Sequence, residues 1–258
     1  MVRKNALKQR LRGGKKSIGC WLMSNNALAA EVLAHCGYDC LIADHEHGPG
    51  DFVGLAHQLA AIGASGPTTL ARVPWNDPVY IKRALDTGLE GIMSPMIESA
   101  AQAKQLVDAC FYPPKGTRGC ATGAIRATMY GADALEYFDQ VNDNLLVIAQ
   151  IETPKGVAAI EDIAAVDGID MLLIGPTDLT VNMGGRPGTQ VGVIAETIAA
   201  AEKRILATGK LLGSVLFGGA TPQQMFDRGY NLIIAGTEMS LLRNAAAAQV
   251  RAHREKNP

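Results

Sequence analysis

Side chains of the types used in acid–base and metal chemistry gather at or directly after the ends of several apolar runs. The groups are Asp44-His45-Glu46-His47, Arg72, Gln150 with Glu152, and Gly175-Pro176-Thr177-Asp178. The beginnings of the runs carry few comparable groups, the exceptions being Asp39, Thr68 and Asn231. In a barrel of parallel strands the active site lies at the carboxyl ends of the strands. This one-sided distribution therefore predicts a single functional site at the carboxyl ends of the strands, which form the mouth of the barrel.

Glu152 and Asp178 are candidate ligands for a divalent cation. They lie one strand–helix unit apart, so on neighbouring strands their backbones would be about 5 Å apart and the two carboxylates could converge on one ion. Two carboxylates with water suit Mg²⁺ or Mn²⁺ better than zinc, which prefers histidine and cysteine. The alternative is that each carboxylate only complements a helix N-terminus or pairs with an arginine. Spacing leaves both interpretations open.

The histidines suit acid–base chemistry better than a zinc cluster. His45 and His47 form a His-x-His pair, but a dinuclear zinc site needs further histidines from later strands. After His57 only His253 follows, so such a site is excluded. What remains is one histidine acting as general base or acid, because imidazole titrates near neutral pH. The pattern does not select between His45 and His47.

Arg72 stands inside an apolar run and therefore needs an anionic partner. It would hold a substrate carboxylate or an enolate oxygen, or else form a structural ion pair with Asp44 or Glu152. No lysine occurs within the apolar runs, which disfavours a Schiff-base mechanism. Further glycines, Gly218-Gly219 and Gly236, fit a phosphate cradle and plain turns equally well.

Eight apolar runs would supply the strands that position these residues. They are Ser17–Met23, Asp39–Ala43, Thr68–Val73, Gly91–Pro95, Leu145–Ile151, Ile169–Ile174, Leu211–Leu216 and Asn231–Ala235. Several are continuous rather than alternating, as expected for parallel strands buried on both faces. Helical patterns separate them, and eight such units need about 250 residues. We therefore expect an α/β fold, a single (β/α)₈ barrel domain over residues 1–258.

The connecting segments add detail to this prediction. Thr189–Ala207 shows helical periodicity, and Asn5–Arg12 is expected to be a short helix that caps the barrel floor. Thr153-Pro154 and Thr221-Pro222 each look like a helix cap followed by proline at the first helical position. Between the fourth and fifth runs a long insertion contains Tyr112-Pro113-Pro114, Arg118-Gly119, Arg126 and Tyr130. Its length favours a lid or an interface segment.

Composition excludes several classes of function. The net charge of −1 gives no basic field for nucleic acid. The basic start, Arg3-Lys4 to Lys15-Lys16, lacks the apolar run of a signal peptide, and no stretch is long enough for a membrane span. The five cysteines are Cys20, Cys36, Cys40, Cys110 and Cys120; they lack CxxC spacing and are expected to be reduced. A cytoplasmic enzyme is the expectation.

Several ordered motifs together resemble the metal-dependent (class II) pyruvate aldolases of the HpcH/HpaI type. The family includes 4-hydroxy-2-oxo-heptanedioate and 2-keto-3-deoxy-sugar-acid aldolases. The motifs are Asp44-His45-Glu46-His47-Gly48-Pro49, Arg72-Val73-Pro74, Leu85-Asp86-Thr87-Gly88, Pro95-Met96, Tyr112-Pro113-Pro114, Gln150-Ile151-Glu152 and Gly175-Pro176-Thr177-Asp178-Leu179. The similarity extends from Ile18-Gly19 to the last helix.

The resemblance implies a role for each motif residue. Glu152 and Asp178 would hold Mg²⁺ or Mn²⁺, with Co²⁺ as an alternative, and the metal would bind a 2-oxo acid as a Lewis acid. The implied substrate-binding residues are Gln150, Gly175, Thr177, Asp178 and Leu216. The implied catalytic residues are His47 as base, Asp86 raising its basicity, Arg72 stabilising the enolate and Asp44 beside the metal ligands.

The implied reaction is reversible aldol cleavage of a 4-hydroxy-2-oxo acid to pyruvate or hydroxypyruvate and an aldehyde. The sequence departs from the family at His45, often a small residue, and at Thr177, commonly Ser or Ala. The aldehyde would be selected by Trp21, Ala121, Leu216 and Phe217. Family members are commonly hexamers, trimers of dimers with an exchanged C-terminal helix, and Met239–His253 has a suitable Ala/Leu-rich face.

Two other functions remain open at this point. One is a related barrel lyase or isomerase that acts on a phosphorylated substrate, with phosphate donors at Gly218 and Gly236. The other is a non-catalytic ligand-binding barrel. The four residues Glu152, Asp178, Arg72 and His47 together argue against a silent scaffold.

Overall fold

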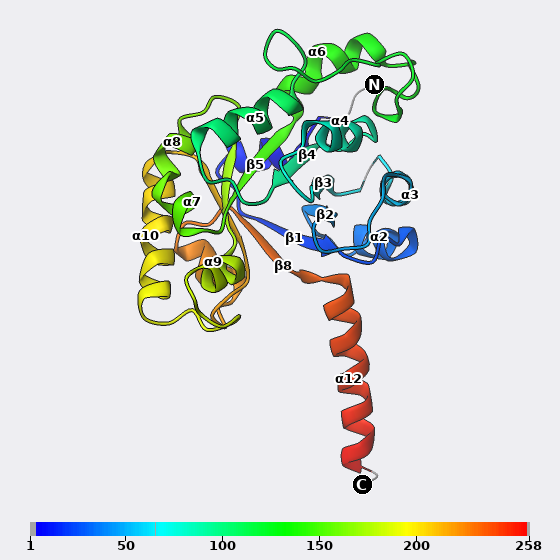
Figure 1. Ribbon diagram of the computed structural model, residues 1–258. Helices are drawn as coiled ribbons and strands as arrows, with labels where there is room; N and C mark the ends of the chain where they lie inside the picture. Colours follow the sequence, from blue (N-terminus) through cyan, green and yellow to red (C-terminus); the bar gives the residue numbers. More distant parts are fainter. Residues whose placement is uncertain (1–3, 65, 257–258) are drawn as a thin grey trace.

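Eight parallel strands close into one barrel in the computed structural model, which describes residues 4–64 and 66–256 (Figure 1). Each strand pairs with the next along the chain, and β8 pairs with β1. The strands are β1 (Ser17–Leu22), β2 (Cys40–Asp44), β3 (Thr68–Arg72), β4 (Gly91–Ser94), β5 (Leu146–Ile151), β6 (Met171–Ile174), β7 (Leu211–Val215) and β8 (Leu232–Thr237). The predicted (β/α)₈ barrel is confirmed. Arg3 of the basic start lies outside the described residues.

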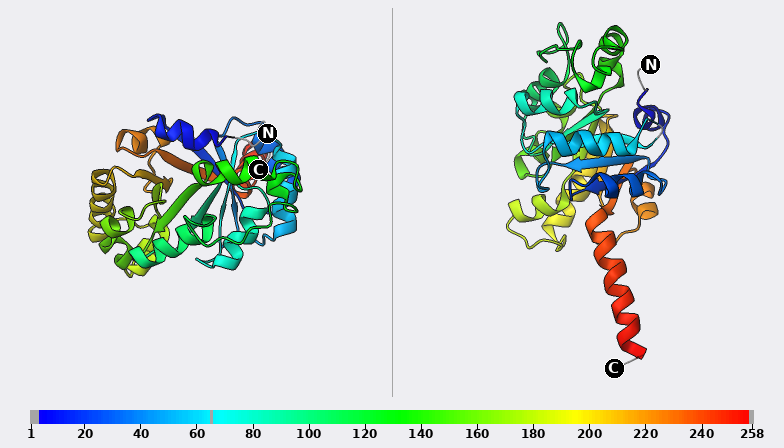
Figure 2. Two further views of the ribbon diagram at one scale, coloured as in Figure 1. Left: turned by 90° about the horizontal axis from the view of Figure 1, so that it is seen from above. Right: turned by 90° about the vertical axis from the view of Figure 1, so that its right-hand side faces the viewer.

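Helices follow the strands and surround the barrel, as Figure 2 shows from two further directions. They are α1 (Ala6–Arg12), α2 (Ala27–Ala34), α3 (Phe52–Ile62), α4 (Pro78–Asp86), α5 (Ala100–Cys110), the 3₁₀ turn η1 (Arg126–Thr128), α6 (Ala134–Asn144), α7 (Pro154–Ala158), α8 (Ile160–Ala164), α9 (Pro176–Asn182), α10 (Val193–Ala207), α11 (Pro222–Asp227) and α12 (Glu238–Lys256). Both predicted threonine caps are confirmed, because Thr153 and Thr221 accept hydrogen bonds from the first turns of α7 and α11.

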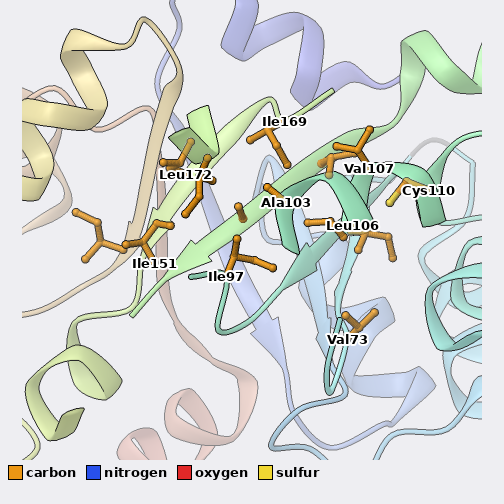
Figure 3. Close-up of a cluster of buried hydrophobic side chains, with 14 of the residues drawn as sticks. Val73, Ile97, Ala103, Leu106, Val107, Cys110, Ile151, Ile169 and Leu172 are labelled. Atoms are coloured by element: carbon orange, nitrogen blue, oxygen red, sulfur yellow. The ribbon is translucent and has the colours of Figure 1, made fainter. Parts of the chain in front are cut away.

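Apolar side chains on the two faces of the strands form separate layers. Inside the barrel, Trp21, Ile42 and Leu173 belong to one buried cluster. The larger cluster lies between the strands and the helices, and Figure 3 shows the part where Leu106 and Val107 of α5 face the strands. Burial on both faces explains why the strand sequences are continuously apolar.

The N-terminal helix closes the floor of the barrel, as predicted. Asn5 caps α1, and its side-chain amide donates to the backbone oxygens of Glu90, at 2.7 Å, and Asn144, at 2.9 Å. Leu7 and Leu11 of α1 are buried in the interior cluster. These contacts fix the helix across the ends where the strands begin, so the opposite end of the barrel is the mouth.

The insertion between β4 and β5 does not form a lid over this chain's own mouth. It follows α5, and a connection from a helix to the next strand lies on the floor side of such a barrel. Arg118 pairs with Asp86 at the end of α4, and Arg126 donates to the backbone oxygen of Thr87, 2.6 Å away. The lid interpretation is therefore not supported in the single chain, whereas an interface role stays a prediction.

The last helix leaves the barrel at the mouth side. In Figures 1 and 2, α12 extends away from the other elements.

The predicted helix Thr189–Ala207 begins later, at Val193, since Gly192 before it has a positive φ of 55°. Among the described residues, no helix is both long and apolar enough to cross a membrane.

Candidate active site

A cavity of about 270 Å³ opens at the mouth of the barrel. Its lining residues come from β1, β3, β5, β6, β7 and the segments that follow β2 and β6: Trp21, His47, Arg72, Gln150, Leu173, Gly175, Pro176, Thr177, Asp178 and Val215. Two further cavities, of about 330 and 460 Å³, lie at the floor end. None of the predicted catalytic, substrate-binding or metal-binding residues lines them, although Gly88, in the turn after Asp86, lines the first. The mouth is therefore the site to consider chemically.

Asp44 and Arg72 form a buried ion pair at one wall of this cavity. The β2–β3 register places the two residues side by side. Arg72 Nε lies 2.9 Å from Asp44 Oδ1, and Nη2 lies 2.6 Å from Oδ2, which is a bidentate arrangement. Glu46 Oε2 lies 3.0 Å from Arg72 Nη1, and the guanidinium stacks 4.4 Å from the ring of Trp21. The pairing with Asp44 is confirmed, while Arg72, 7% exposed, still faces the cavity.

Glu152 is a buried carboxylate whose pKa is raised well above the usual value of a glutamate. Only 2% of the residue is exposed, and burial raises its pKa to about 7, against a smaller opposing effect of the hydrogen bond from the Met96 N–H. The charges of Glu46 and Asp178 raise the pKa further. Met96 N lies 2.8 Å from Glu152 Oε1, and the amide of Gln150 donates to Oε2. Within the described part of the chain, ionised Glu152 therefore has no positively charged side chain in direct contact.

Asp178 reaches the same region from the neighbouring strand. The β5–β6 register pairs Ile151 with Ile174, so the residues that follow both strands meet at one edge. Gly175 makes this approach possible, since a Cβ at that position would lie 2.5 Å from Glu152 Oε2. Thr177 and Asp178 lie in the first turn of α9, at the cavity wall. The two predicted carboxylates thus belong to one electrostatic cluster.

These residues fit a divalent cation. Within the described residues, no three His, Cys, Asp or Glu side chains form a ready cluster. A cation would take Glu152 and Asp178, with substrate and water oxygens as its further ligands, the oxygen-rich set that Mg²⁺ and Mn²⁺ favour. Gln150 Oε1 is also buried and has no hydrogen-bond partner among the described residues, so it could accept from a bound group or a water on the cation. A cation would offset both the burial and the repulsion from Glu46 and Asp178 that raise the Glu152 pKa.

The two candidate histidines point to different places. His47 lines the cavity with an exposed side chain, and its Nε2 lies 3.8 Å from Glu46 Oε2. His45 is buried instead against α4, where its Nδ1 lies 2.7 Å from the hydroxyl of Tyr80. The structure thus brings His47, and not His45, to the cavity.

Several predicted residues are not brought to the cavity. Asp86 ends α4 on the floor side, 2.7 Å from Arg118 Nη2, so within one chain it cannot act on His47. Ala121 lies in the insertion on that same side. Leu216 packs with the outer cluster, and Phe217 lies beneath the guanidinium of Arg228, while Val215 lines the cavity instead.

The glycines proposed for a phosphate cradle are explained by the backbone. Gly218 and Gly219 have φ values of 60° and 71°, a region that glycine adopts readily. Each occupies open space, where an added Cβ would meet nothing within 4 Å. Their conformation supports the turn interpretation.

Glu46 is the site residue that sequence reasoning left without a role. It joins Arg72 to His47, and burial raises its pKa, against the attraction of the Arg72 charge. Its position between two histidines, directly after a strand, is the feature of the sequence that could have identified it. The backbone N–H of Met96 could not be identified in this way, because every residue except proline has such a donor.

A comparison of the sequence with protein families finds one match over most of the chain. Residues 17–245 match the family described as HpcH/HpaI aldolase/citrate lyase. A hydroxypyruvate/pyruvate aldolase of Roseovarius nubinhibens is 37% identical over 94% of this chain and 94% of its own length. A 4-hydroxy-2-oxo-heptane-1,7-dioate aldolase of Salmonella dublin is 36% identical over 98% of this chain and 97% of its own.

Solved structures share the same barrel. An HpcH/HpaI aldolase/citrate lyase family protein from Burkholderia cenocepacia superposes with a TM-score of 0.92 at 35% identity, covering 97% of this chain and 99% of that one. An HpcH/HpaI aldolase from Desulfitobacterium hafniense gives a TM-score of 0.88 at 28% identity, with 96% of each chain covered. The similarity therefore extends over the whole barrel and is not limited to one motif.

Proposed function

The chain belongs to the HpcH/HpaI aldolase/citrate lyase family, and we propose that it is a divalent-metal-dependent aldolase. The proposed reaction is reversible cleavage of a 4-hydroxy-2-oxo acid to pyruvate or hydroxypyruvate and an aldehyde. Relatives that share more than a third of the sequence are named as aldolases of these two kinds, and aldolases are carbon–carbon lyases. We extend the activity to one domain, residues 1–258, of which the family match covers 17–245.

The observation that carries the proposal is the pair formed by Glu152 and Asp178. Asp178 lines the cavity together with Gln150 and Arg72. Burial, with the charges of Glu46 and Asp178, raises the pKa of Glu152 beside it. Glu152 and Asp178 would hold the cation. When bound, it supplies Lewis acidity, which draws electron density from the 2-oxo group of the substrate.

The other side chains have distinct tasks in this proposal. Gln150, Gly175 and Thr177 surround the space beside the carboxylates and would hold the substrate carboxylate and carbonyl. Arg72 donates two hydrogen bonds to Asp44 and forms an ion pair with Glu46, so its remaining N–H groups can stabilise the oxygen on which enolate charge develops. Asp44 fixes the plane of the guanidinium.

His47, which lines the cavity, would move the proton. In cleavage its imidazole takes the proton of the C4 hydroxyl, the C4 oxygen becomes the carbonyl of the aldehyde, and the electrons of the C3–C4 bond pass into the enolate of the 2-oxo acid. Protonation of C3 then gives pyruvate or hydroxypyruvate. Trp21, Leu173 and Val215 form the apolar part of the cavity wall. No observation favours a phosphorylated substrate or a silent barrel.

We further propose that copies of the chain assemble into a hexamer. Helix α12 carries exposed apolar side chains, among them Leu241 and Leu242, the latter 65% exposed. Burying such a face against another copy would remove apolar area from water. The resemblance to the family predicts this exchange.

The function can be tested with enzyme stripped of metal by a chelator. Pyruvate or hydroxypyruvate would be mixed with a panel of aldehydes, with Mg²⁺ or Mn²⁺ restored in parallel samples, and product formation followed by chromatography. We expect turnover only in the metal-restored samples. Equal turnover in the stripped samples, or none with any aldehyde, would contradict the proposal.

A further inference from the structure

His45 is a buried polar residue on the outer side of the barrel wall, directly before the segment that carries His47. Its exposed fraction is 7%. The ring meets Tyr80 of α4 edge-on, with centroids 6.0 Å apart and an interplanar angle of 84°, and Nδ1 lies 2.7 Å from the tyrosine hydroxyl. Tyr80 packs in turn against Phe52 at the start of α3, 4.7 Å between centroids. The histidine thus joins the segment after β2 to two helices.

The chain after His47 turns back, so that the backbone of Gly50 lies against the His45 ring. A Cβ built at Gly50 would lie 2.6 Å from His45 Cδ2 and 2.7 Å from Nε2, so only a glycine backbone fits against the ring here. Residues 46–49 therefore form a loop whose two ends meet at one side chain. The backbone N–H of His45 donates to the Arg72 oxygen at 2.9 Å, which ties the start of the loop to β3.

The placement of His47 depends on this backbone rather than on its own side-chain contacts. Its side chain makes no hydrogen bond within the part of the chain that the structure describes, and its polar neighbour Glu46 lies 3.8 Å away. On the inner side the loop is held by Asp44 Oδ1, which accepts from the N–H groups of Glu46, at 3.1 Å, and His47, at 3.4 Å. On the outer side it is held by His45.

Among the residues that the structure describes, the hydroxyl of Tyr80 is the one polar partner of the His45 ring. His45 Nε2 is buried without a hydrogen-bond partner among the described residues. Removing the hydroxyl would therefore leave both ring nitrogens unpaired in a buried place, which costs more than an exposed hydrogen bond would. The ring would then leave its position, and the loop would lose its outer anchor.

We propose that the contact between His45 and Tyr80 is a clamp that positions His47 for proton transfer. His45 and Tyr80 are positioning residues, since neither lines the cavity. The inference rests on the proposed function insofar as it names His47 as the base. The chain uses α4, which lies outside the barrel, to fix the geometry of a residue at the mouth.

The test uses the full-length, metal-loaded enzyme with Tyr80→Phe, which removes the hydroxyl and keeps the ring on Phe52. We expect kcat to fall about threefold to tenfold, the effect of one lost hydrogen bond, while KM for the 2-oxo acid stays unchanged. Tyr130→Phe is the matched control, because Tyr130 is 71% exposed, and it should leave kcat as it is. His45→Asn, which keeps a polar group near the position of Nδ1, should retain more activity than His45→Ala.

A second arm separates positioning from general loosening. In a His47→Ala background, Tyr80→Phe should cause no further loss of kcat, because the residue that the clamp positions is already gone. Hydrogen exchange should become about threefold to tenfold faster at the amides of Glu46, His47, Gly48 and Gly50 in Tyr80→Phe and stay unchanged in Tyr130→Phe.

Two results would overturn the clamp: an equal kcat loss from Tyr80→Phe in both backgrounds, or unchanged exchange and kcat in Tyr80→Phe. A wild-type enzyme without aldolase activity would instead refute the proposed function. The exchange experiment would still decide whether the clamp exists.

Discussion

At the scale of single residues, the charge of Glu152 governs the candidate site. The carboxylate is buried, its pKa is raised to about 7, and it accepts hydrogen bonds from two neutral amides, the Met96 N–H and the Gln150 side chain. A buried anion in such surroundings is costly unless a cation accompanies it. The same residue that would make the site a metal centre is therefore a source of instability when the cation is removed.

Glu152→Gln should abolish turnover while the protein remains folded. The amide keeps the shape of the side chain, removes the buried charge and binds a divalent cation poorly. We expect activity below detection together with a thermal unfolding midpoint at neutral pH, without metal, equal to or above that of the wild type. An active variant would show that Glu152 is not a ligand.

The pH dependence of metal affinity follows from the raised pKa of Glu152. The cation binds the ionised carboxylate, so affinity for Mn²⁺ should be constant above about pH 7 and weaken about tenfold for each pH unit below it. In metal-free protein the sign is opposite: a raised acidic pKa contributes stability at low pH that is lost as the pH rises through about 7. Calorimetric titration and thermal unfolding, each with Glu152→Gln as control, measure the two trends.

His47→Ala should lower kcat by about 10²- to 10⁴-fold, the usual contribution of a general base. Metal affinity should not change, because His47 is not among the proposed ligands. His57→Ala, an exposed histidine on α3, serves as the control. An unchanged rate in His47→Ala would remove the residue from the mechanism.

The sequence was sufficient to predict which residues converge at the mouth, but not how each is oriented. Asp44, Arg72, Gln150 and Asp178 could be grouped because the ends of parallel strands share one edge. The choice between His45 and His47 depends on the path of a short loop, and that path is set by Tyr80, a residue 35 positions later. Such a distant contact leaves no trace in local periodicity.

At the scale of elements, continuous apolar runs located all eight strands to within about two residues. The insertion was the harder case. Because it follows the helix Ala100–Cys110 and not the strand before it, its position on the floor side was available from the order of elements. Its length alone suggested a lid, since long loops in barrels often cover the site.

The insertion is anchored by a buried ion pair. The side chain of Arg118 is fully buried, lies 3.1 Å from the Tyr137 hydroxyl and pairs with Asp86. We predict that Asp86→Ala lowers the free energy of unfolding by about 3 kcal/mol, because it leaves a buried guanidinium without its anion. Chemical denaturation measures this change. An unaltered stability together with a shifted pH–rate profile would instead support the role in tuning His47 that family resemblance implies.

At the scale of the whole molecule, the barrel leaves α12 without an intramolecular surface to cover most of its length. Figure 1 shows the helix extending from β8, and its exposed apolar residues include Met239, Leu242 and Val250. Exposed apolar surface of this extent is typical of an interface. The sequence predicted the helix and its apolar face, whereas the proposed partner surface would lie on another copy of the chain and leaves no pattern in the sequence of α12 itself.

Leu242→Glu should weaken the assembly. A charge on the apolar face of α12 would have to be buried at the interface, which is unfavourable. Light scattering coupled to size-exclusion chromatography should give a hexamer for the wild type and smaller species for the variant. Arg254→Glu, near the exposed end of α12, is a control for the change in charge. A monomeric wild type would contradict the proposed exchange of helices.

The location of the cation tests the account most directly. Crystals grown with Mn²⁺ would be measured for anomalous scattering, which identifies the ion independently of activity. We predict one peak at the mouth, within about 2.2 Å of carboxylate oxygens from both Glu152 and Asp178, the bond length of a hard divalent cation of this size. An ordered mouth with no peak there, or a peak bound by other residues, would contradict the metal site on which the proposed aldolase mechanism depends.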